Sequence, residues 1–499
     1  MLFNSFGFAA FFCVLYVVYL MSMRRLAVQN LILLVGSYFF YGCWDWRFLG
    51  LILLSTGIDF VCGWALDRRR EPPPADLTEA AAPCYRHSPG ARRGILVCSV
   101  AANLGILGFF KYYDFFAAGC AELLGAMGLP LDPRLLNVIL PVGISFYTFQ
   151  TLSYTIDVYR GKLRAHRSLL QFAVFVAFFP QLVAGPIVRA RDFLPQISKP
   201  RRLDLDQVYA GGYLILWGLF KKVVIADNLA ILVDGVFSAD PTPFGGAVLV
   251  ALYAFAVQIY CDFSGYSDIA RGLSKLMGID IRLNFKLPYF ASNPAEFWRR
   301  WHISLSTWLR DYLYIPLGGN RKGTRRTCIN LMLTMILGGL WHGAAWTFVI
   351  WGAYQGLLLM VHKAAMPWIE RIAASWTGRL RAVYKWLAIG LFFHLICLGW
   401  LAFRAESVDQ ISRMLGALCT PWLWWMIHGA IGIGETDVTT LLIYALPLVL
   451  IQLAQYAKDD LDVVLRMPAF ARGLAYSLMF YCLVLFGARL DQPFLYFQF

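Results

Sequence analysis

Apolar runs of roughly 17–25 residues, the length that crosses a bilayer as a helix, recur along the whole chain. Hydrophobic residues make up 59% of the sequence and charged residues only 15%, below the roughly one quarter that is typical of soluble domains. The runs do not alternate as the strands of a membrane β-barrel do. The sequence therefore predicts an all-α polytopic membrane protein.

These runs predict about 11 transmembrane helices, together with re-entrant or interfacial pieces. The helical runs are 3–22, 29–45, 47–66, 95–117, 136–157, 168–187, 207–234, 246–262, 328–361, 384–403, 438–456 and 472–490. The run 328–361 is too long for one crossing and contains three glycines, which predicts two helical pieces. The run 168–187 ends in Val183-Ala184-Gly185-Pro186, which indicates a short or re-entrant element.

Basic residues gather in loops between the apolar runs, as the positive-inside rule expects of cytoplasmic loops. This pattern explains the formal net charge of +14 without any binding of nucleic acid. The loop 67–94, with its proline triplet, is predicted to be flexible and cytoplasmic. The basic loop 263–327 is predicted to be cytoplasmic or re-entrant and to contain the catalytic region. Counting spans from these loops puts both termini outside the cytoplasm, and one membrane domain over residues 1–499 fits the pattern.

His342 indicates chemistry because it stands alone in a long apolar stretch. It follows Gly338-Gly339-Leu340-Trp341, and between Arg326 and His362 it is the only Asp, Glu, Lys, Arg or His. An ionisable group at membrane depth is costly, which makes a functional role the first hypothesis. An imidazole with an ordinary pKa of about 6.5 can take a proton from a hydroxyl. A structural histidine that bonds a neighbouring helix would give the same pattern.

His302 lies on the apolar side of a predicted amphipathic helix. Aromatic residues and leucines recur at helical spacing from Phe297 to Tyr312, and Asn293 followed by Pro294 is a typical helix start. Tryptophans and arginines on such a helix are typical of an element at the membrane interface. An interfacial role does not explain a histidine on the apolar side, so His302 is the second predicted catalytic residue.

A glycine-rich turn at 317–320 follows this helix and is flanked by cations. Backbone N–H groups and arginines favour phosphate groups, so the cations predict a site for a phosphate-bearing donor. The predicted donor-binding residues are Arg310, Arg321, Lys322, Arg325 and Arg326. A cytoplasmic flank that follows the positive-inside rule would carry the same residues.

A polar cluster at 262–268 lies at the end of an apolar run, where it can line a cavity or cap helices. The residues predicted to line a passage are Asp262, Ser264, Tyr266, Trp341 and Asn320. The cysteines are scattered singly, so no metal site and no disulfide is indicated. The sequence has no Gly-x-Ser-x-Gly elbow and no Walker A motif, which argues against a serine hydrolase and an ATPase.

The run 296–306, followed by Leu340-Trp341-His342-Gly343, resembles the membrane-bound O-acyltransferase family. The similarity is greatest to the bacterial branch that contains the membrane subunit of alginate O-acetylation. Further motifs that resemble this branch are 141–147, 184–186, 262–268, 317–321 and 496–499. Gln181 departs from the pattern, because the alginate proteins have His at the equivalent position. This departure weakens the case for alginate as the substrate.

The resemblance implies a ring of helices around a central tunnel and an O-acyltransferase that carries acetyl groups. It assigns the family's invariant histidine to His342 and its second histidine to His302. It implies a cytoplasmic thioester donor, acetyl-CoA or an acyl carrier, and no permanently bound cofactor. The implied acceptor is an extracytoplasmic polysaccharide, reached directly or through an SGNH-type acetyltransferase partner. The implied location is the bacterial cytoplasmic (inner) membrane.

Three other functions stay open from the sequence. A related branch transfers D-alanyl groups from a carrier protein in teichoic acid synthesis. A transporter of acyl groups could use the histidines in a proton path, although transporters often have matching halves and the sequence has none that we detect. A scaffold for a synthase complex would need no chemistry at all.

Overall fold

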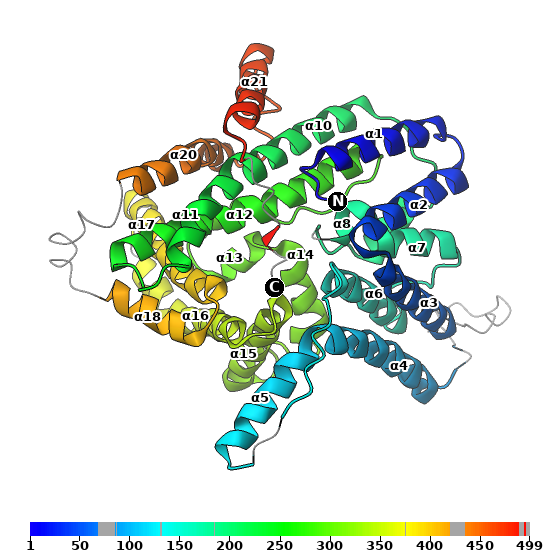
Figure 1. Cartoon of the computed structure of the whole chain (residues 1–499), viewed down its shortest axis with the longest axis horizontal. Coiled ribbons are helices and arrows are strands. Elements are labelled where there is room, and N and C mark those ends of the chain that lie inside the picture. Colours follow the sequence, from blue (N-terminus) through cyan, green and yellow to red (C-terminus); the bar gives the residue numbers. More distant parts are fainter. Residues whose placement is uncertain are drawn as a thin grey trace. The chain divides into compact units, whose positions relative to one another are not determined.

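The structure is a computed structural model that describes residues 1–67, 85, 87–129, 132–183, 185–374, 376–419, 435–488 and 494–495. Every regular element in this described part of the chain is a helix (Figure 1), which confirms the predicted fold class. The C-terminal motif at 496–499 and most of the predicted flexible loop 67–94 lie outside the described residues.

The described chain divides into two compact units. Unit 1 is Met1–Val208 with Ser274–Ile281, and unit 2 is Tyr209–Leu273 with Arg282–Phe499. The helices up to α9 are α1 (Phe6–Met21), α2 (Leu26–Asp45), α3 (Leu49–Leu66), α4 (Pro89–Leu107), α5 (Tyr113–Ala126), α6 (Ile144–Tyr159), α7 (Leu169–Ala177), α8 (Phe179–Leu182) and α9 (Ala190–Ile197). The later ones are α10 (Leu205–Leu219), α11 (Asp227–Phe237), α12 (Gly245–Leu276), α13 (Pro294–Arg300), α14 (Ile303–Leu309), α15 (Gly323–His342), α16 (Trp346–Ala373), α17 (Gly378–Arg404), α18 (Val408–Leu418), α20 (Glu435–Lys458) and α21 (Ala469–Phe486). The prediction of a single membrane domain stays a prediction.

Six stretches of described helix are long and apolar enough to cross a membrane. They are Leu26–Leu66, Pro89–Ala126, Gly245–Leu276, Gly378–Arg404, Asp437–Lys458 and Ala469–Phe486. Large apolar side chains such as Phe480 and Leu485 are exposed on α21, as expected of a helix whose surroundings are lipid. The protein is therefore a multi-pass membrane protein, while the count of about 11 spans stays a prediction.

Both predicted interruptions of the apolar runs are confirmed. In the run 168–187, α7 has nine residues, a length of roughly 14 Å, which is about half the thickness of the hydrocarbon core. In the run 328–361, α15 ends at His342, Gly343 has extended backbone, and α16 begins at Trp346. The second interruption matters for function because it falls directly after the isolated histidine.

Glycines let α15 and α16 pack with their backbones close together. A methyl group on Gly339 would clash with the backbone carbonyl of Phe348, and one on Gly352 would clash with that of Met335. Small residues at a helix–helix contact permit this close approach in membrane proteins. The contact fixes the end of α15, and with it the position of His342.

The continuous helix predicted through Phe297–Tyr312 is wrong, because the structure breaks it at His302. The predicted start is confirmed: Asn293 caps α13 by accepting a hydrogen bond from the backbone N–H of Glu296 at 2.9 Å. The helix ends at Arg300, and α14 starts at Ile303. The N–H of Ile303 donates to the carbonyl of Asn284 at 2.9 Å, so tertiary pairing replaces the helical hydrogen bonds that the local periodicity predicts.

Candidate active site

The two predicted catalytic histidines lie beside each other in unit 2. His302 is the residue before α14 and His342 is the last residue of α15. Their ring centroids are 6.3 Å apart, and both side chains are buried. Two residues 40 positions apart in the sequence therefore form one buried imidazole pair.

The backbone of His302 is in the left-handed region, with φ of +42°. This region is uncommon for residues other than glycine, although His, Asn and Asp enter it more often than most. The conformation turns the chain between α13 and α14 and points the imidazole into the interior of unit 2. Strain of this kind is found where surrounding structure holds a residue in place, often at functional sites.

Asn284 orients the ring of His302. The backbone N–H of Ser304 donates to Asn284 Oδ1 at 3.2 Å and the Ser304 hydroxyl donates to it at 2.9 Å, which fixes the orientation of the amide. His302 Nδ1 lies 3.2 Å from the same oxygen. Because a carbonyl oxygen only accepts hydrogen bonds, this contact favours the tautomer with its proton on Nδ1. The other ring nitrogen, Nε2, is then an acceptor.

Burial also sets the charge of His302, which lies between α13 and α14 and outside the helices long enough to cross a membrane. Desolvation lowers the pKa of His302 from its ordinary value of 6.5 to about 3. A positive charge in this surrounding would be poorly solvated, so the imidazole is neutral at physiological pH. A neutral ring suits orientation of a hydroxyl.

Aromatic rings surround His342 on several sides. Its ring centroid lies 5.0 Å from Trp341, 5.2 Å from Trp351 of α16 and 5.3 Å from Phe403 of α17. Each of these neighbours meets the imidazole edge-on. The packing fixes the ring and lowers the local dielectric, which strengthens any electrostatic interaction made there.

The ring of His302 is enclosed in the same way. Phe263 lies 4.6 Å away, Trp341 5.9 Å and Phe285 6.4 Å. Trp341 therefore contacts both histidines. Both imidazoles are therefore covered by aromatic side chains. The predicted central tunnel stays a prediction.

A small pocket of about 110 Å³ approaches this centre from one side. Lys221, Ser264 and Asp268 line it, and so does Phe285, whose ring also borders His302. The Lys221 ammonium donates to Ser264 Oγ at 2.9 Å and pairs with Asp268 at 2.7 Å. The ring of Phe285 thus borders both the polar pocket and the imidazole.

The predicted passage-lining residues are only partly brought together. Trp341 is at the centre, and Ser264 lines the small pocket. Asp262 pairs with Lys222 at 2.6 Å and accepts a hydrogen bond from the backbone N–H of Leu495 at 2.9 Å. Tyr266 is buried with its ring 4.9 Å from that of Phe494. Asn320 is exposed and accepts a hydrogen bond from the Tyr314 hydroxyl at 3.0 Å, so it lies with the cationic turn.

The predicted donor-binding cations are on the surface, and two of them lie at the opposite end of α15 from His342. All five are exposed, and Arg310 pairs with Asp311 at 2.8 Å. Arg325 and Arg326 are in the first turn of α15, whereas His342 ends the same helix. At a rise of 1.5 Å per residue, the backbones of Arg325 and His342 are roughly 26 Å apart.

Several residues around the histidines carry no signal in the sequence. Asn284 follows a turn and has no local motif, and Trp351 and Phe403 read as ordinary aromatic residues of apolar runs. They meet the imidazoles only because α16 and α17 pack against the end of α15. Within the described residues, no group of three His, Cys, Asp or Glu side chains is placed to hold a metal ion.

The fold and the site together define a class of protein. It is an all-helical, multi-pass membrane protein with a buried pair of histidines enclosed by aromatic rings. The model of the family "MBOAT, membrane-bound O-acyltransferase family" matches residues 161–402, which include both histidines. The chain is 38% identical to a probable alginate O-acetylase of Pseudomonas putida and 40% identical to one of Azotobacter vinelandii, over all of each chain. It is 34% identical to a peptidoglycan O-acetyltransferase of Helicobacter pylori, over 77% of this chain and 72% of the relative. The protein belongs to the membrane-bound O-acyltransferase family and is an acyltransferase.

Proposed function

We propose that this protein transfers an acetyl group from a cytoplasmic thioester donor to a hydroxyl of an extracytoplasmic polysaccharide, with His342 as the general base. The observation that carries the proposal is the buried pair His302–His342, with rings 6.3 Å apart, in a chain similar over its whole length to alginate O-acetylases. The acceptor is a polysaccharide in this proposal because relatives are named for alginate and peptidoglycan.

In the proposed reaction, the acceptor hydroxyl attacks the thioester carbonyl. His342 takes the hydroxyl proton as the new C–O bond forms, and passes it to the sulfur as the C–S bond breaks. The products are an acetyl ester and a free thiol. Help from a general base of this kind contributes roughly 10²–10⁴ to the rate.

His302 acts as the residue that orients the acceptor hydroxyl. The contact with Asn284 favours the proton on Nδ1, so Nε2 is the hydrogen-bond acceptor of the ring in this tautomer. Polarising the thioester carbonyl through Nε2 would require the opposite tautomer. The geometry therefore supports hydroxyl orientation more than carbonyl polarisation.

Access to the histidines requires side-chain movement in this proposal. Phe285 borders both the polar pocket of Lys221, Ser264 and Asp268 and the ring of His302. In this proposal, movement of that ring opens a route from the pocket toward the imidazole. Aromatic side chains that close a site also exclude water, which would otherwise hydrolyse the thioester.

The donor, the partners and the orientation are part of the same proposal. Acetyl-CoA or an acyl carrier supplies the thioester, with its phosphates at the cations Arg310, Arg321, Lys322, Arg325 and Arg326, and no cofactor stays bound. The protein lies in the bacterial inner membrane with both termini outside the cytoplasm. It acetylates the polysaccharide directly or hands acetyl to an SGNH-type acetyltransferase.

The test uses full-length protein in lipid nanodiscs with radiolabelled acetyl-CoA and an oligosaccharide acceptor. The wild type should form a labelled ester, and His342→Ala should lose it while keeping the wild-type elution profile. The matched control is His394→Ala, because His394 is an exposed histidine of α17 that bonds the carbonyl of Gly390 in its own helix. Ester formation by His342→Ala at the wild-type rate would refute the assignment.

D-alanyl transfer and acyl transport give different results in the same assay. A D-alanyl transferase would use a D-alanyl carrier and leave acetyl-CoA untouched. A transporter would move label across a sealed vesicle without forming an ester. A scaffold would do neither.

A further inference from the structure

A second polar site lies in unit 1, around a buried arginine that the proposed reaction does not use. Arg201 is only 5% exposed. Its Nε donates to the hydroxyl of Tyr19 at 2.7 Å and its Nη2 donates to the side-chain oxygen of Asn30 at 2.8 Å. These two acceptors are uncharged, so they orient the guanidinium without neutralising it.

Arg201 has no carboxylate partner among the residues that the structure describes. The nearby carboxylate of Asp280 pairs with Lys275 at 3.0 Å. Nη1 of Arg201 is buried and has no hydrogen-bond acceptor in the described part of the chain. Burying a charge is costly unless an opposite charge accompanies it, which indicates an anion from outside the chain.

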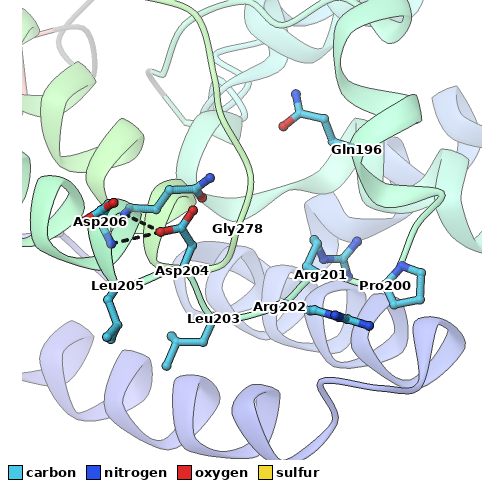
Figure 2. Close-up of a pocket in the computed structure, with 10 residues that line it drawn as sticks. Gln196, Pro200, Arg201, Arg202, Leu203, Asp204, Leu205, Asp206 and Gly278 are labelled. Atoms are coloured by element: carbon cyan, nitrogen blue, oxygen red, sulfur yellow. Dashed lines mark hydrogen bonds between the residues drawn. The ribbon is translucent and has the colours of Figure 1, made fainter.

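Arg201 lines an open pocket of about 730 Å³ (Figure 2). Arg202 is exposed and also lines it, next to Leu203 and Leu205, which are 45% and 73% exposed. A pocket with two arginines and two exposed leucines matches a ligand that is ionic at one end and apolar at the other. Arginine is well suited to phosphate because its N–H groups bind two oxygens at once.

Two aspartates complete the lining. Asp204 accepts hydrogen bonds from the backbone N–H groups of Asp206 and Gln207 at 3.0 and 3.3 Å, which directs its charge to the start of α10. Asp206 is exposed. Figure 2 shows the aspartates on one side of the pocket and the arginines on the other. This arrangement of charges matches a head group that carries both a phosphate and an ammonium.

We propose that this pocket binds the head group of a phosphatidylethanolamine-type phospholipid, with its phosphate at Arg201 and Arg202 and its ammonium at Asp204 and Asp206. The acyl chains would lie along Leu203 and Leu205. The stretch 189–203, which contains both arginines, carries five basic residues and one acidic residue. The positive-inside rule places such a basic stretch on the cytoplasmic side, where the head groups of that leaflet lie.

The test measures lipid binding by native mass spectrometry, and thermal unfolding, of the full-length protein in detergent. The probes are dioleoylphosphatidylethanolamine, dioleoylphosphatidylglycerol, dioleoylglycerol and inorganic phosphate. The ethanolamine lipid should bind and raise the unfolding temperature, as a ligand of the folded state does. Dioleoylglycerol lacks the phosphate and should do neither.

Arg202→Gln should weaken binding of the ethanolamine lipid about tenfold, and it leaves the internal hydrogen bonds of Arg201 intact. Arg201→Gln should abolish binding, but it can also destabilise the fold, so the decision rests on Arg202→Gln. The matched control is Arg191→Gln, since Arg191 belongs to the same unit and does not line the pocket. Asp206→Asn should weaken binding of dioleoylphosphatidylethanolamine and leave binding of dioleoylphosphatidylglycerol unchanged.

Each contrary result overturns a stated part. If dioleoylglycerol bound as well as the ethanolamine lipid, the proposed phosphate contact would be wrong. If inorganic phosphate alone raised the unfolding temperature, the ligand would be a soluble phosphate and not a lipid. Equal binding of the two phospholipids would remove the ammonium contact. If Arg191→Gln weakened lipid binding as much as Arg202→Gln, the binding would be a non-specific effect of positive charge.

Discussion

Two buried polar centres, one in each unit, are built on opposite plans. In unit 1, Asp59 of α3 accepts hydrogen bonds from Ser99 at 2.6 Å, Thr155 at 3.0 Å and Asn103 at 2.8 Å. Those donors come from α4 and α6, so one carboxylate ties three helices together. In unit 2, His302 and His342 are packed mainly among aromatic rings.

The difference is between a carboxylate that ties helices together by hydrogen bonds and two imidazoles that are held mainly by aromatic packing. The hydrogen bonds that Asp59 accepts are directional and engage both of its oxygens, so a change there should affect folding. Aromatic packing holds an imidazole in place mainly through ring contacts, and the proposed reaction uses the ring's capacity to exchange a proton. Mutations at the two centres should therefore affect different quantities.

The largest expected effect is on the rate, at His342. His342→Gln keeps a polar side chain of similar size but cannot act as a base, so it should lower acetyl transfer by roughly 10²–10⁴. The unfolding temperature should stay close to that of the wild type, because the surrounding rings remain. Initial-rate measurements with thermal unfolding on the same preparation test this. A large drop in unfolding temperature would make His342 structural, like Asp59.

The next largest effect is on stability, at Asp59. Asp59→Ala leaves three buried donors without their acceptor and should destabilise the protein by about 2–5 kcal/mol. The acetyl transfer rate per folded molecule should be unchanged. Asp59→Asn keeps one acceptor oxygen and should lose less. The comparison fails if Asp59→Ala lowers the turnover of the folded fraction and leaves the unfolding transition in place.

An intermediate effect is expected at Asn284. This residue combines both kinds of support, because it holds His302 by a hydrogen bond within the aromatic surroundings. Asn284→Ala should lower the rate about tenfold, mostly in kcat, because His302 loses its orientation. Asn284→Asp keeps the acceptor oxygen and should recover part of the rate. A merely structural Asn284 would show a stability loss without this recovery in kcat.

A further expected effect is a pH dependence of stability from His302. The folded-state pKa of about 3 lies below the ordinary value of 6.5, so the unfolded state binds the proton more readily. Stability from this residue is complete above pH about 6.5 and falls as the pH decreases from there, by about 1.4 kcal/mol per unit. Between pH 7 and pH 5, the wild type should lose about 2 kcal/mol more than His302→Gln in equilibrium unfolding. Parallel pH profiles for the two proteins would contradict the burial argument.

The sequence predicted those features that are local. The isolation of His342, the helix start at Asn293 and the interruption at Gly343 can each be read within a few residues. The enclosing rings could not be predicted, because Trp351 and Phe403 belong to other helices and look like ordinary lipid-facing aromatics.

The helical break at His302 shows why the remaining details were out of reach. Its periodicity favours one helix, yet Asn284, which lies 18 residues earlier in the chain, supplies the partners that end it. Local propensity competes with tertiary pairing, and here the tertiary pairing prevails. Similarly, nothing near Arg201 in the sequence indicates that Tyr19 and Asn30 hold its guanidinium.

The length of helix α15 sets the length that the proposed donor needs. The backbones of Arg325 and His342 are roughly 26 Å apart, so a thioester held by its phosphates at Arg325, as proposed, would have to extend over a distance of that order to place its carbonyl carbon at the imidazole. Only a donor with a long, slender tether satisfies that distance. A minimal thioester such as S-acetyl-N-acetylcysteamine would reach the histidines without touching the anchor, and its turnover would be indifferent to the charges there.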